Sequence, residues 1–395
     1  MGMNFARRLV GLQEKMTEIG LDLVIYGNCQ NFQYLTDLFG GGVEAVIDWR
    51  SHIDMQTSEV NNIFVPREGE PILILSDQFA GHASEVWISD VRVLDRRLVQ
   101  VGKYGESVNE VISDLGLEGN KVGIGDHVYG STVVALQRTV DNAEFYAAEA
   151  LLDHLRVIKD PLEIERLRKA GELTDRVMER VIPKIRDGVT QYELQFEVEY
   201  QGRRIGATDV SFPPTVGFVK SGSVPSPTPS NVPKDGGLEP GTCIYFDIGF
   251  VMDGYCSDFG RSFYFGPASV EVKKGYEALQ QSVVETVDKM HDDSMRGCDL
   301  FPTVEKILDR LGYGDCLRAR LGESRSLGHN IGIEVHEHPW LNPNYDNRLC
   351  ANIVMALEPK LWHSGEYYMR VEDIVLVGTN TSEFLTQFDR ELFQL

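Results

Sequence analysis

The first part of the chain alternates amphipathic segments with short runs of apolar residues. Apolar side chains recur every three or four positions in a surface helix, whereas a buried strand is a short apolar run between turn residues. These patterns predict helices over 4–19, 104–115 and 131–140, and strands over 22–26, 62–65 and 71–75. A further helix is predicted from Ala143 to about Leu155. Such alternation is typical of an α/β sheet domain.

A longer amphipathic helix is predicted to begin after Asp160. Its apolar residues recur with helical spacing from Ile164 onwards, and Asp160 and Pro161 suit the N-cap and the first helical position. Another helix is predicted to begin after Thr190, because Glu193 follows three residues later and the two side chains can form a capping box. At 395 residues the chain is long for a single core, so two domains are expected.

Two aspartates lie beside apolar runs in a pattern that predicts a hairpin. Asp247 ends the run that begins at Cys243, and Asp258 follows eleven residues later. A turn is predicted at 253–255, and the apolar-rich segment 259–265 follows Asp258. We expect the two strands of this hairpin to bring both carboxylates together.

Three more ionisable residues follow in similar surroundings. His329 lies among glycines, Glu358 closes the apolar run 353–357, and Glu372 interrupts the apolar run 371–377. A charge buried in such a run is costly unless it is paired, protonated or bound to a metal ion. Any one of these acidic residues alone reads as a turn residue or a strand-end charge, but metal binding explains all of them together. Four carboxylates and one imidazole are the ligand set of a site that holds two divalent ions around a bridging water.

Short motifs along the chain resemble, in the same order, those of the creatinase, prolidase and aminopeptidase P family of "pita-bread" hydrolases. Near the N-terminus the similar segments are 7–9, 20–25 and 31–36, and 155–164 is similar to the joint at which that family's catalytic domain begins. The segments similar to the family's metal motifs are 246–249, 254–258, 328–332, 335–337, 357–359 and 370–373. The resemblance implies an α+β fold, in which an N-terminal creatinase/prolidase-like α/β domain (1–155) precedes a C-terminal pita-bread catalytic domain (156–395). In the second domain, helices would cover a curved antiparallel sheet.

The resemblance also implies roles for the five ionisable residues. Asp258, His329 and Glu372 would hold one divalent ion, with Glu372 also bridging to the other. Asp247 would hold the second ion, helped by Asp258 and Glu358. A set rich in oxygen with one His favours Mn, Fe, Co or Zn. The ions would make hydroxide available near neutral pH, and Glu358 would be the catalytic proton shuttle.

Two positions depart from the proline-directed members of that family. Those enzymes carry a His upstream of the first Asp ligand, whereas this chain has no His between His154 and His291 and reads SGSVPSPTPSN over 221–231. A second family His, four residues before the ligand His, is replaced by Arg325, and the third is kept as His336. The family uses these histidines to stabilise an oxyanion and to steady the substrate. Ordinary Xaa-Pro cleavage therefore does not follow from the resemblance.

The candidate substrate-binding residues are Arg325, Arg370 and His336, and His336 is also a candidate catalytic residue. The Arg325 guanidinium would suit a substrate carboxylate or an oxyanion. Alternatively, it solvates a loop or pairs with Glu323. Arg370 matches a family position near the substrate, and the alternative for it is a structural salt bridge.

Family members are usually dimers in which a loop from one N-terminal domain reaches the partner's active site. In this chain a glycine run at 40–42 is followed by Trp49, Arg50 and His52. We hypothesise that these three side chains close the neighbouring site of a homodimer. The alternative is an ordinary surface loop.

Composition limits the partners and the location. Charged residues make up 25% and apolar residues 42%, which is ordinary for a globular protein. A net charge of −22 argues against nucleic acid and anionic membranes as partners. The N-terminal segment predicts an amphipathic helix rather than a signal peptide, and no apolar stretch is long enough to span a membrane, so a cytoplasmic protein is expected.

Three classes of function are compatible with the sequence. The one we favour is a dinuclear metal-dependent hydrolase that cleaves an amide or other C–N bond of a small substrate, either an Xaa-Pro-type dipeptide or a modified amino acid. The second is a metal-dependent lyase or a non-peptidase hydrolase on the same fold. The third is a non-catalytic binding relative, which the retention of all five ligand positions disfavours.

Overall fold

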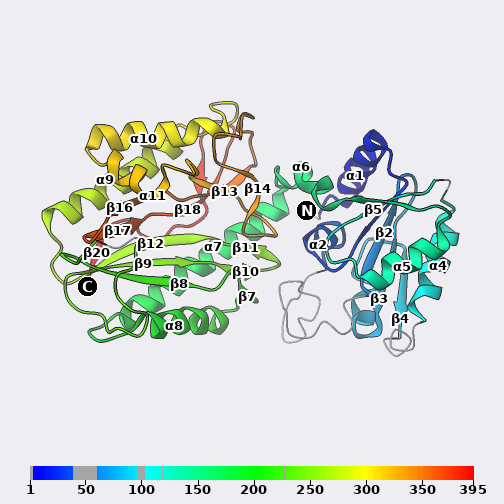
Figure 1. Ribbon diagram of the computed structural model, residues 1–395, viewed down its shortest axis with the longest axis horizontal. Helices are drawn as coiled ribbons and strands as arrows, with labels where there is room; N and C mark the ends of the chain where they lie inside the picture. The colour runs from blue at the N-terminus through cyan, green and yellow to red at the C-terminus, as the bar shows by residue number, and fades with distance from the viewer. Residues whose placement is uncertain (1–2, 39–59, 96–102, 118, 226–227) are drawn as a thin grey trace. The chain divides into compact units, whose positions relative to one another are not determined.

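The computed structural model describes residues 3–38, 60–95, 103–117, 119–225 and 228–395. This part of the chain forms two compact units, and the division falls between Leu155 and Arg156. Figure 1 shows a sheet with flanking helices in the first unit and several sheets with long helices in the second. Trp49, Arg50 and His52 lie outside the described residues, so the hypothesis about them stays a prediction.

The first unit is built on a six-stranded mixed sheet with the strand order β4-β3-β2-β1-β5-β6. The strands are β1 (Leu23–Tyr26), β2 (Asn62–Pro66), β3 (Ile72–Ser76), β4 (Asp90–Leu94), β5 (Lys121–Ile124) and β6 (Glu144–Ala147). Strand β2 runs antiparallel to both β1 and β3, and the other pairs are parallel. The three strands predicted from apolar runs are confirmed.

Helices of the first unit pack on this sheet as their apolar spacing predicts. They are α1 (Phe5–Ile19), α2 (Gln30–Thr36), α4 (Tyr104–Leu115) and α5 (Gly130–Thr139). Val108 of α4 and Leu136 of α5 lie in one buried apolar cluster with Ile25 and Phe64 of the sheet. Helix α1 begins where the side chain of Asn4 accepts a hydrogen bond from the backbone N–H of Arg7.

The helix predicted from Ala143 to Leu155 is wrong. Residues 144–147 form β6, which pairs with β5 in parallel register, and a short 3₁₀ helix (Glu149–Leu152) and α6 (Asp153–Arg156) follow. Local propensity over this segment favours a helix, but the exposed backbone of β5 offers hydrogen bonds to a neighbouring strand. Pairing with a distant segment outweighs local preference here.

The second unit begins with two helices whose ends were predicted correctly. In α7 (Pro161–Val181) the Asp160 side chain accepts hydrogen bonds from the backbone N–H groups of the first turn, and the Glu163 carboxylate accepts one from the backbone N–H of Asp160. Helix α8 (Gln191–Arg204) begins with the same arrangement between Thr190 and Glu193. Both are capping boxes, which satisfy backbone N–H groups that lack partners within the helix.

The strands of the second unit form mainly antiparallel sheets that carry the candidate site. One sheet has the order β20-β12-β9-β8 and another the order β14-β13-β15-β18-β19, while β11-β10-β7 and β16-β17 are smaller. The bounds are β7 (Asp209–Val210), β8 (Thr215–Lys220), β9 (Thr242–Ile248), β10 (Phe250–Met252), β11 (Tyr255–Cys256), β12 (Phe259–Phe265), β13 (Gly328–Asn330), β14 (Glu337–Trp340), β15 (Val354–Leu357), β16 (Lys360–His363), β17 (Tyr367–Arg370), β18 (Asp373–Leu376), β19 (Glu383–Phe384) and β20 (Phe393–Gln394).

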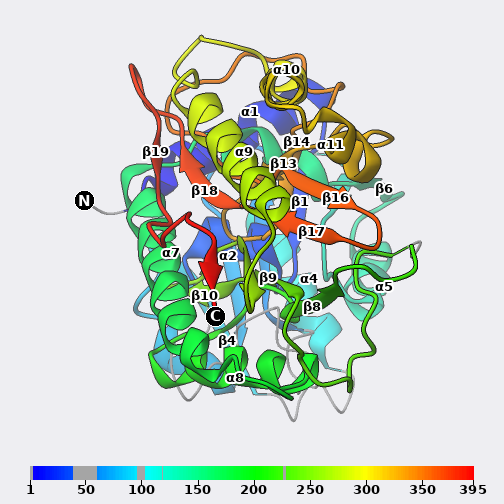
Figure 2. The ribbon, with the colours of Figure 1, turned by 90° about the vertical axis from the view of Figure 1, so that its left-hand side faces the viewer.

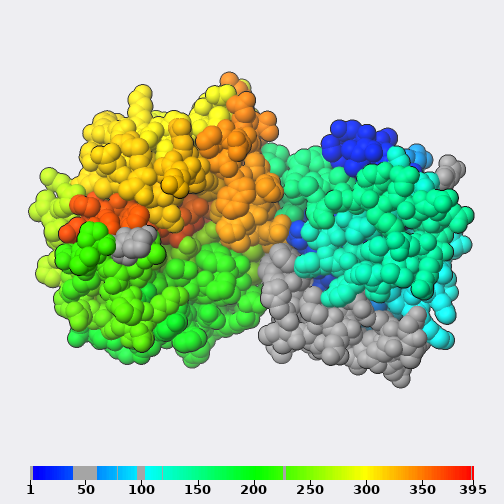
Figure 3. All heavy atoms as spheres, viewed as in Figure 1, coloured from blue at the N-terminus to red at the C-terminus, as the bar shows by residue number. Residues whose placement is uncertain are grey.

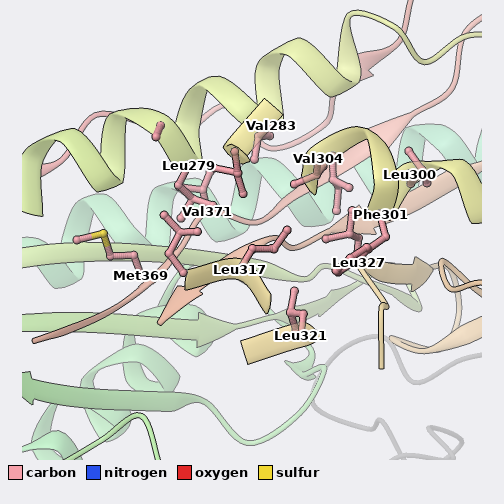
Figure 4. Packing of buried hydrophobic residues seen from close by; sticks show 14 of the residues in the cluster. Leu279, Val283, Leu300, Phe301, Val304, Leu317, Leu321, Leu327, Met369 and Val371 are labelled. Atoms are coloured by element: carbon pink, nitrogen blue, oxygen red, sulfur yellow. The ribbon is translucent and has the colours of Figure 1, made fainter. Parts of the chain in front are cut away.

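Three further helices cover one side of these strands. They are α9 (Val270–Val287), α10 (Leu300–Leu311) and α11 (Gly314–Leu321). Figure 2 shows α9 crossing in front of β16 and β17, which it contacts, while α8 lies at the other side of the unit. In Figure 4, Leu279 and Val283 of α9 lie close to Met369 and Val371 in the buried core of this layer. The segment on either side of Arg370 is thereby held against a close-packed apolar layer.

The hairpin of β16 and β17 comes to the surface between the helices α9 and α10 and the strands β8 and β9 (Figure 3). Its first strand becomes more exposed along its length, from buried Lys360 to exposed His363. Among the described residues, no helix is long and apolar enough to cross a membrane.

Candidate metal centre

Asp247 and Asp258 lie on the hairpin that the sequence predicts. Strands β9 and β12 pair antiparallel over seven residues each, and Asp247 faces Gly260. Between them, β10 and β11 are joined by a tight turn at Asp253 and Gly254, whose φ angles are 49° and 78°. Positive φ at both central residues is typical of the turns that join two-residue hairpins. Asp258 follows this turn and is buried directly before β12.

Glu372 joins the same row of residues from another part of the chain. It forms an isolated bridge with Gly260, so Asp247, Gly260 and Glu372 lie side by side across three segments. A Cβ atom on Gly260 would lie 2.6 Å from side-chain atoms of Arg370. Glycine is therefore required here, because its missing side chain leaves the space that Arg370 occupies. Glu372 lies between the end of β17 and the start of β18, so the strand within the apolar run 371–377 begins only at Asp373.

His329 and Glu358 come from neighbouring strands of the five-stranded sheet. His329 in β13 faces Ala356 in β15, and Glu358 directly follows β15. The backbone N–H of Glu358 donates to the carbonyl of Leu327. Gly328 has a φ of 137°, and a Cβ atom there would lie 2.0 Å from the carbonyl oxygen of Ala356. Only glycine allows the two backbones to approach this closely beside His329.

These side chains form two overlapping groups with the geometry of metal ligands. Ligand atoms of Asp247, Asp258 and Glu372 all lie within 4.8 Å of one another, as do those of Asp258, His329 and His336. Among the described residues, Oδ1 of Asp258 and Oε1 of Glu372 are buried and accept no hydrogen bond, whereas Oε2 of Glu372 lies 2.7 Å from Arg370. Buried carboxylate oxygens of this kind require a cation. The residues present therefore fit divalent metal ions.

Two basic side chains lie among these carboxylates. Arg370 forms ion pairs with Asp247, with Glu358 at 2.8 Å and with Glu372 at 2.7 Å. Lys360 donates to the same oxygen of Glu358, Oε2. Glu358 belongs to neither ligand group and is joined to them through Arg370. For Arg370, the salt bridge considered from the sequence is therefore present.

Lys360 was missed by the sequence reasoning. The signal available was its position two residues after Glu358, since side chains at i and i+2 of an extended segment point to the same side.

The pKa values of the acidic groups and of His329 follow from burial and from their partners. Burial raises the pKa of Glu372 to about 8, against the opposing charge of Arg370. It also raises the pKa of Asp258 above its ordinary value. Burial lowers the pKa of His329, but the hydrogen bond and charge of Asp258 outweigh it and raise the pKa to about 9. Burial disfavours the charge on Glu358 too, yet Lys360 and His329 lower its pKa. Of Asp258, Glu358 and Glu372, only Glu358 has side-chain partners that outweigh burial and favour its ionised form.

His336 lies at the open side of the group. Its ring centroid is 4.4 Å from that of His329, and it stacks on Trp340 at 5.1 Å. Burial and the charge of His329 lower the pKa of His336 to about 4, so the ring is neutral at pH 7. A neutral imidazole can donate one N–H and accept at its other nitrogen. The ring is placed to touch a molecule at the centre or to act as a further ligand.

The structure does not bring Arg325 to this group. Its guanidinium lies over the ring of Phe301, 5.3 Å from the ring centre, and its side chain is exposed. Ser230, which lies in the segment that lacks the family His, has its hydroxyl within hydrogen-bonding distance of the carbonyls of Phe218 and Val232. Neither residue has a described contact with the candidate ligands, and the substrate-binding role of Arg325 stays a prediction.

The residue after His336 is fixed by a buried ionic cluster. Arg156 lies 2.6 Å from one oxygen of Glu337, and Lys159 lies 2.8 Å from the other. Arg156 also binds the half-buried Glu334 at 2.7 Å. Arg156, Lys159 and Glu337 are all buried. Burial raises the pKa of Glu337, but the two cations outweigh it and lower the pKa to about 2. The cluster therefore anchors the loop that carries His336.

Two family models together match most of the chain. Residues 165–379 match the model of metallopeptidase family M24, and residues 8–158 match the creatinase/prolidase N-terminal domain. The first match covers more than half of the chain. The chain belongs to metallopeptidase family M24. As an M24 protein it is a metal-dependent peptidase hydrolase, and the family implies a divalent metal cofactor. The family resemblance and the α+β fold class expected from the sequence are thereby confirmed.

Similar proteins are peptidases by name. The M24 chain is 30% identical over 270 residues to "Putative dipeptidase YkvY" of Bacillus subtilis, a match that covers 68% of this chain and 71% of YkvY. It is 29% identical over 236 residues to an uncharacterized peptidase of Staphylococcus saprophyticus, covering 60% of this chain and 64% of that protein.

Solved structures of similar fold span the whole chain. A prolidase from Thermococcus sibiricus has a TM-score of 0.79 and 26% identity, with 100% of both chains covered. An Xaa-Pro dipeptidase from Bacillus anthracis has a TM-score of 0.80 and 23% identity, covering 99% of this chain and 100% of the other. At 23% identity, the similarity to the Bacillus anthracis protein shows a shared fold.

Proposed function

We propose that this M24 chain is a dinuclear metal-dependent hydrolase that cleaves an amide bond of a small dipeptide-like substrate. The observation that carries the proposal is the pair of ligand groups that share Asp258. Two groups with one common carboxylate suit two adjacent divalent ions, because a carboxylate has two oxygens and can bind one ion with each.

The residues proposed to hold the ions are Asp247, Asp258, His329, Glu358 and Glu372. Oxygen-rich ligands with one imidazole suit Mn, Co, Fe or Zn. Two divalent ions bound there would supply a water of lowered pKa, so that hydroxide is available near neutral pH. Arg370 would keep the carboxylates of Asp247 and Glu372 in place through its ion pairs.

The remaining steps fall to side chains of this chain. Lys360 and His329 lower the pKa of Glu358, and Lys360 and Arg370 donate hydrogen bonds to it, so the ionised carboxylate can accept a proton from the attacking water and deliver it to the leaving amine. His336 is neutral and can donate an N–H to the oxyanion that forms as the carbonyl is attacked. Both are therefore proposed as catalytic residues.

The names of the relatives favour dipeptides as substrates, and Xaa-Pro dipeptides are one class among them. The segment 221–231, which lacks the family His, is the reason to test other dipeptides and N-acyl amino acids beside Xaa-Pro compounds. A homodimer and a cytoplasmic location stay predictions.

The test is turnover of a panel of such compounds after removal and return of metal. We expect chelation to abolish hydrolysis, and Mn, Co, Fe or Zn to restore it. Solvent ¹⁸O should enter the released carboxylate, which distinguishes hydrolysis from elimination. Undiminished turnover in the chelated protein, or a product without solvent oxygen, would contradict the proposal.

A further inference from the structure

Lys360 lies inside the candidate centre. It is only 9% exposed, and it faces Arg370 across the paired strands β16 and β17. Directly opposite residues of a strand pair point to the same side of the sheet, so the two cations share one environment. Besides Glu358, the charge of Lys360 acts on Asp258, His336 and Glu372. Lys360 is therefore part of the reaction site and not of the surrounding shell.

Lys360 and Arg370 differ in how many carboxylates they pair with. Both terminal nitrogens of Arg370 pair with carboxylates, namely those of Asp247, Glu358 and Glu372, and its Nε–H alone has no partner among the described residues. An ammonium group carries three N–H donors. Among the described residues, Glu358 alone accepts a hydrogen bond from the Lys360 ammonium. Lys360 has donors available for an oxygen atom that does not belong to the protein.

The net charge of the centre also favours binding of an external anion beside Lys360. This step rests on the proposed function, because it assumes two bound divalent ions. Four carboxylates match two divalent ions in charge, which leaves Lys360 and Arg370 as excess cations. A hydroxide would offset only one of them. A buried uncompensated ammonium is costly, so a second anion is expected when a substrate is bound.

We propose that Lys360 binds a carboxylate of the substrate next to the scissile amide. The substrate class is therefore a dipeptide-like molecule with a free carboxylate, as opposed to a longer peptide or a carboxamide. Lys360 thus does what the sequence suggested for Arg325, whose guanidinium lies over Phe301 instead. The competing account is that Lys360 serves only as the counter-charge of Glu358.

The two accounts predict different results with matched ligands. Glycyl-L-leucine and L-alanyl-L-proline would each be compared with their C-terminal carboxamides as substrates of the Mn-loaded protein. We expect the wild type to prefer the carboxylates in kcat/KM by about tenfold to a hundredfold, the effect of one charge-assisted hydrogen bond. In Lys360→Met the preference should fall below about threefold, and Lys360→Arg should keep part of it. Lys273→Met, on the exposed side of α9, is the matched control and should behave as the wild type.

A binding measurement separates this proposal from the proposed function. Calorimetric titration of the Mn-loaded proteins with L-leucine and L-leucinamide, and with L-proline and L-prolinamide, compares the binding of a carboxylate with that of a neutral carboxamide. No bond is cleaved in these measurements. If no dipeptide is cleaved but the wild type binds the carboxylates more tightly and Lys360→Met does not, the hydrolase proposal fails and the role of Lys360 stands. If the wild type shows no preference, or Lys360→Met keeps it, the role of Lys360 is overturned. Metal content measured on each variant excludes loss of the ions as the cause.

Discussion

Lys360 and Arg370 face each other across β16 and β17, and both donate a hydrogen bond to the same oxygen of Glu358. Burial disfavours the charge on Glu358, but the charges of Lys360 and His329 outweigh burial and lower its pKa, so Glu358 stays ionised. An ionised carboxylate is what both a metal ligand and a proton acceptor require. This arrangement prepares Glu358 for either role.

Arg370→Met should make stability depend on metal. The substitution leaves Asp247, Glu358 and Glu372 with one buried cation fewer, which should cost about 3–5 kcal/mol of unfolding free energy in chelator. Added Mn should recover most of the loss, because divalent ions supply the missing positive charge. Denaturant unfolding with and without metal measures both quantities.

Arg310→Met is the control for this experiment. Arg310 pairs with Glu285 on the surface, where an ion pair contributes less than about 1 kcal/mol. If Arg370→Met loses as much unfolding free energy with added Mn as it does in chelator, Arg370 and the metal do not share the role of balancing the charge of the carboxylates.

Gly260→Ala should disturb the centre by steric overlap. The new methyl would lie 2.6 Å from side-chain atoms of Arg370, and Arg370 cannot move freely because three carboxylates hold it. We expect a loss of about 1–3 kcal/mol in stability, together with weaker metal binding. Gly130→Ala is the control, since a Cβ there meets no atom within 4 Å. Equal stability and equal metal binding in the two variants would show that a side chain is tolerated at position 260, and would contradict this prediction.

Glu337→Gln should lower stability at neutral pH and change its dependence on acid. The folded-state pKa of Glu337 is about 2, below its ordinary value of 4.5, so its contribution is present above pH 4.5 and is lost as the pH falls toward 2. The variant should be less stable by about 3–5 kcal/mol at pH 7, because Arg156 and Lys159 lose their buried partner. The difference should shrink on acidification.

Denaturant unfolding at pH 7, 5 and 3.5 measures this trend. Glu334→Gln is the control within the same cluster, because Glu334 is partly exposed and contacts only Arg156 among the two cations. Glu334→Gln should lose less unfolding free energy at pH 7 than Glu337→Gln. A difference between Glu337→Gln and the wild type that stays constant with pH would contradict the assignment.

His336→Ala should impair catalysis and leave metal content unchanged. Loss of one donor to an oxyanion lowers kcat by about a hundredfold to a thousandfold. Because the pKa of His336 is about 4, its protonation should not affect activity between pH 6 and 8. His363→Ala, at the exposed end of β16, is the control and should keep wild-type kcat. Loss of a metal equivalent in His336→Ala would make His336 a ligand instead of a catalytic donor.

Local signals in the sequence predicted much of this architecture. The capping residues Asp160 and Thr190 and the turn at Asp253 act over a few positions, so their effect can be read directly from the chain. The approach of Asp247 to Asp258 followed from a hairpin, which is also local. The family resemblance supplied the partners that lie far apart in sequence.

Long-range pairing accounts for the features that were missed. Strand β6 forms because its backbone pairs with that of β5. Glu372 lies outside the neighbouring strands because it forms an isolated bridge with Gly260. Lys360 enters the centre through the pairing of β16 with β17. The sequence pattern alone does not specify any of these partners.

Counting the metal ions bound per chain tests the central claim most directly. Asp258 belongs to both ligand groups, whereas Asp253 lies half-buried at the nearby turn and pairs with Lys169, so Asp258→Asn and Asp253→Asn are a matched pair. Equilibrium binding followed by elemental analysis should give two equivalents of divalent metal for the wild type and for Asp253→Asn. Asp258→Asn should retain fewer than two and lose hydrolysis. Two equivalents with normal turnover in Asp258→Asn would contradict the dinuclear centre.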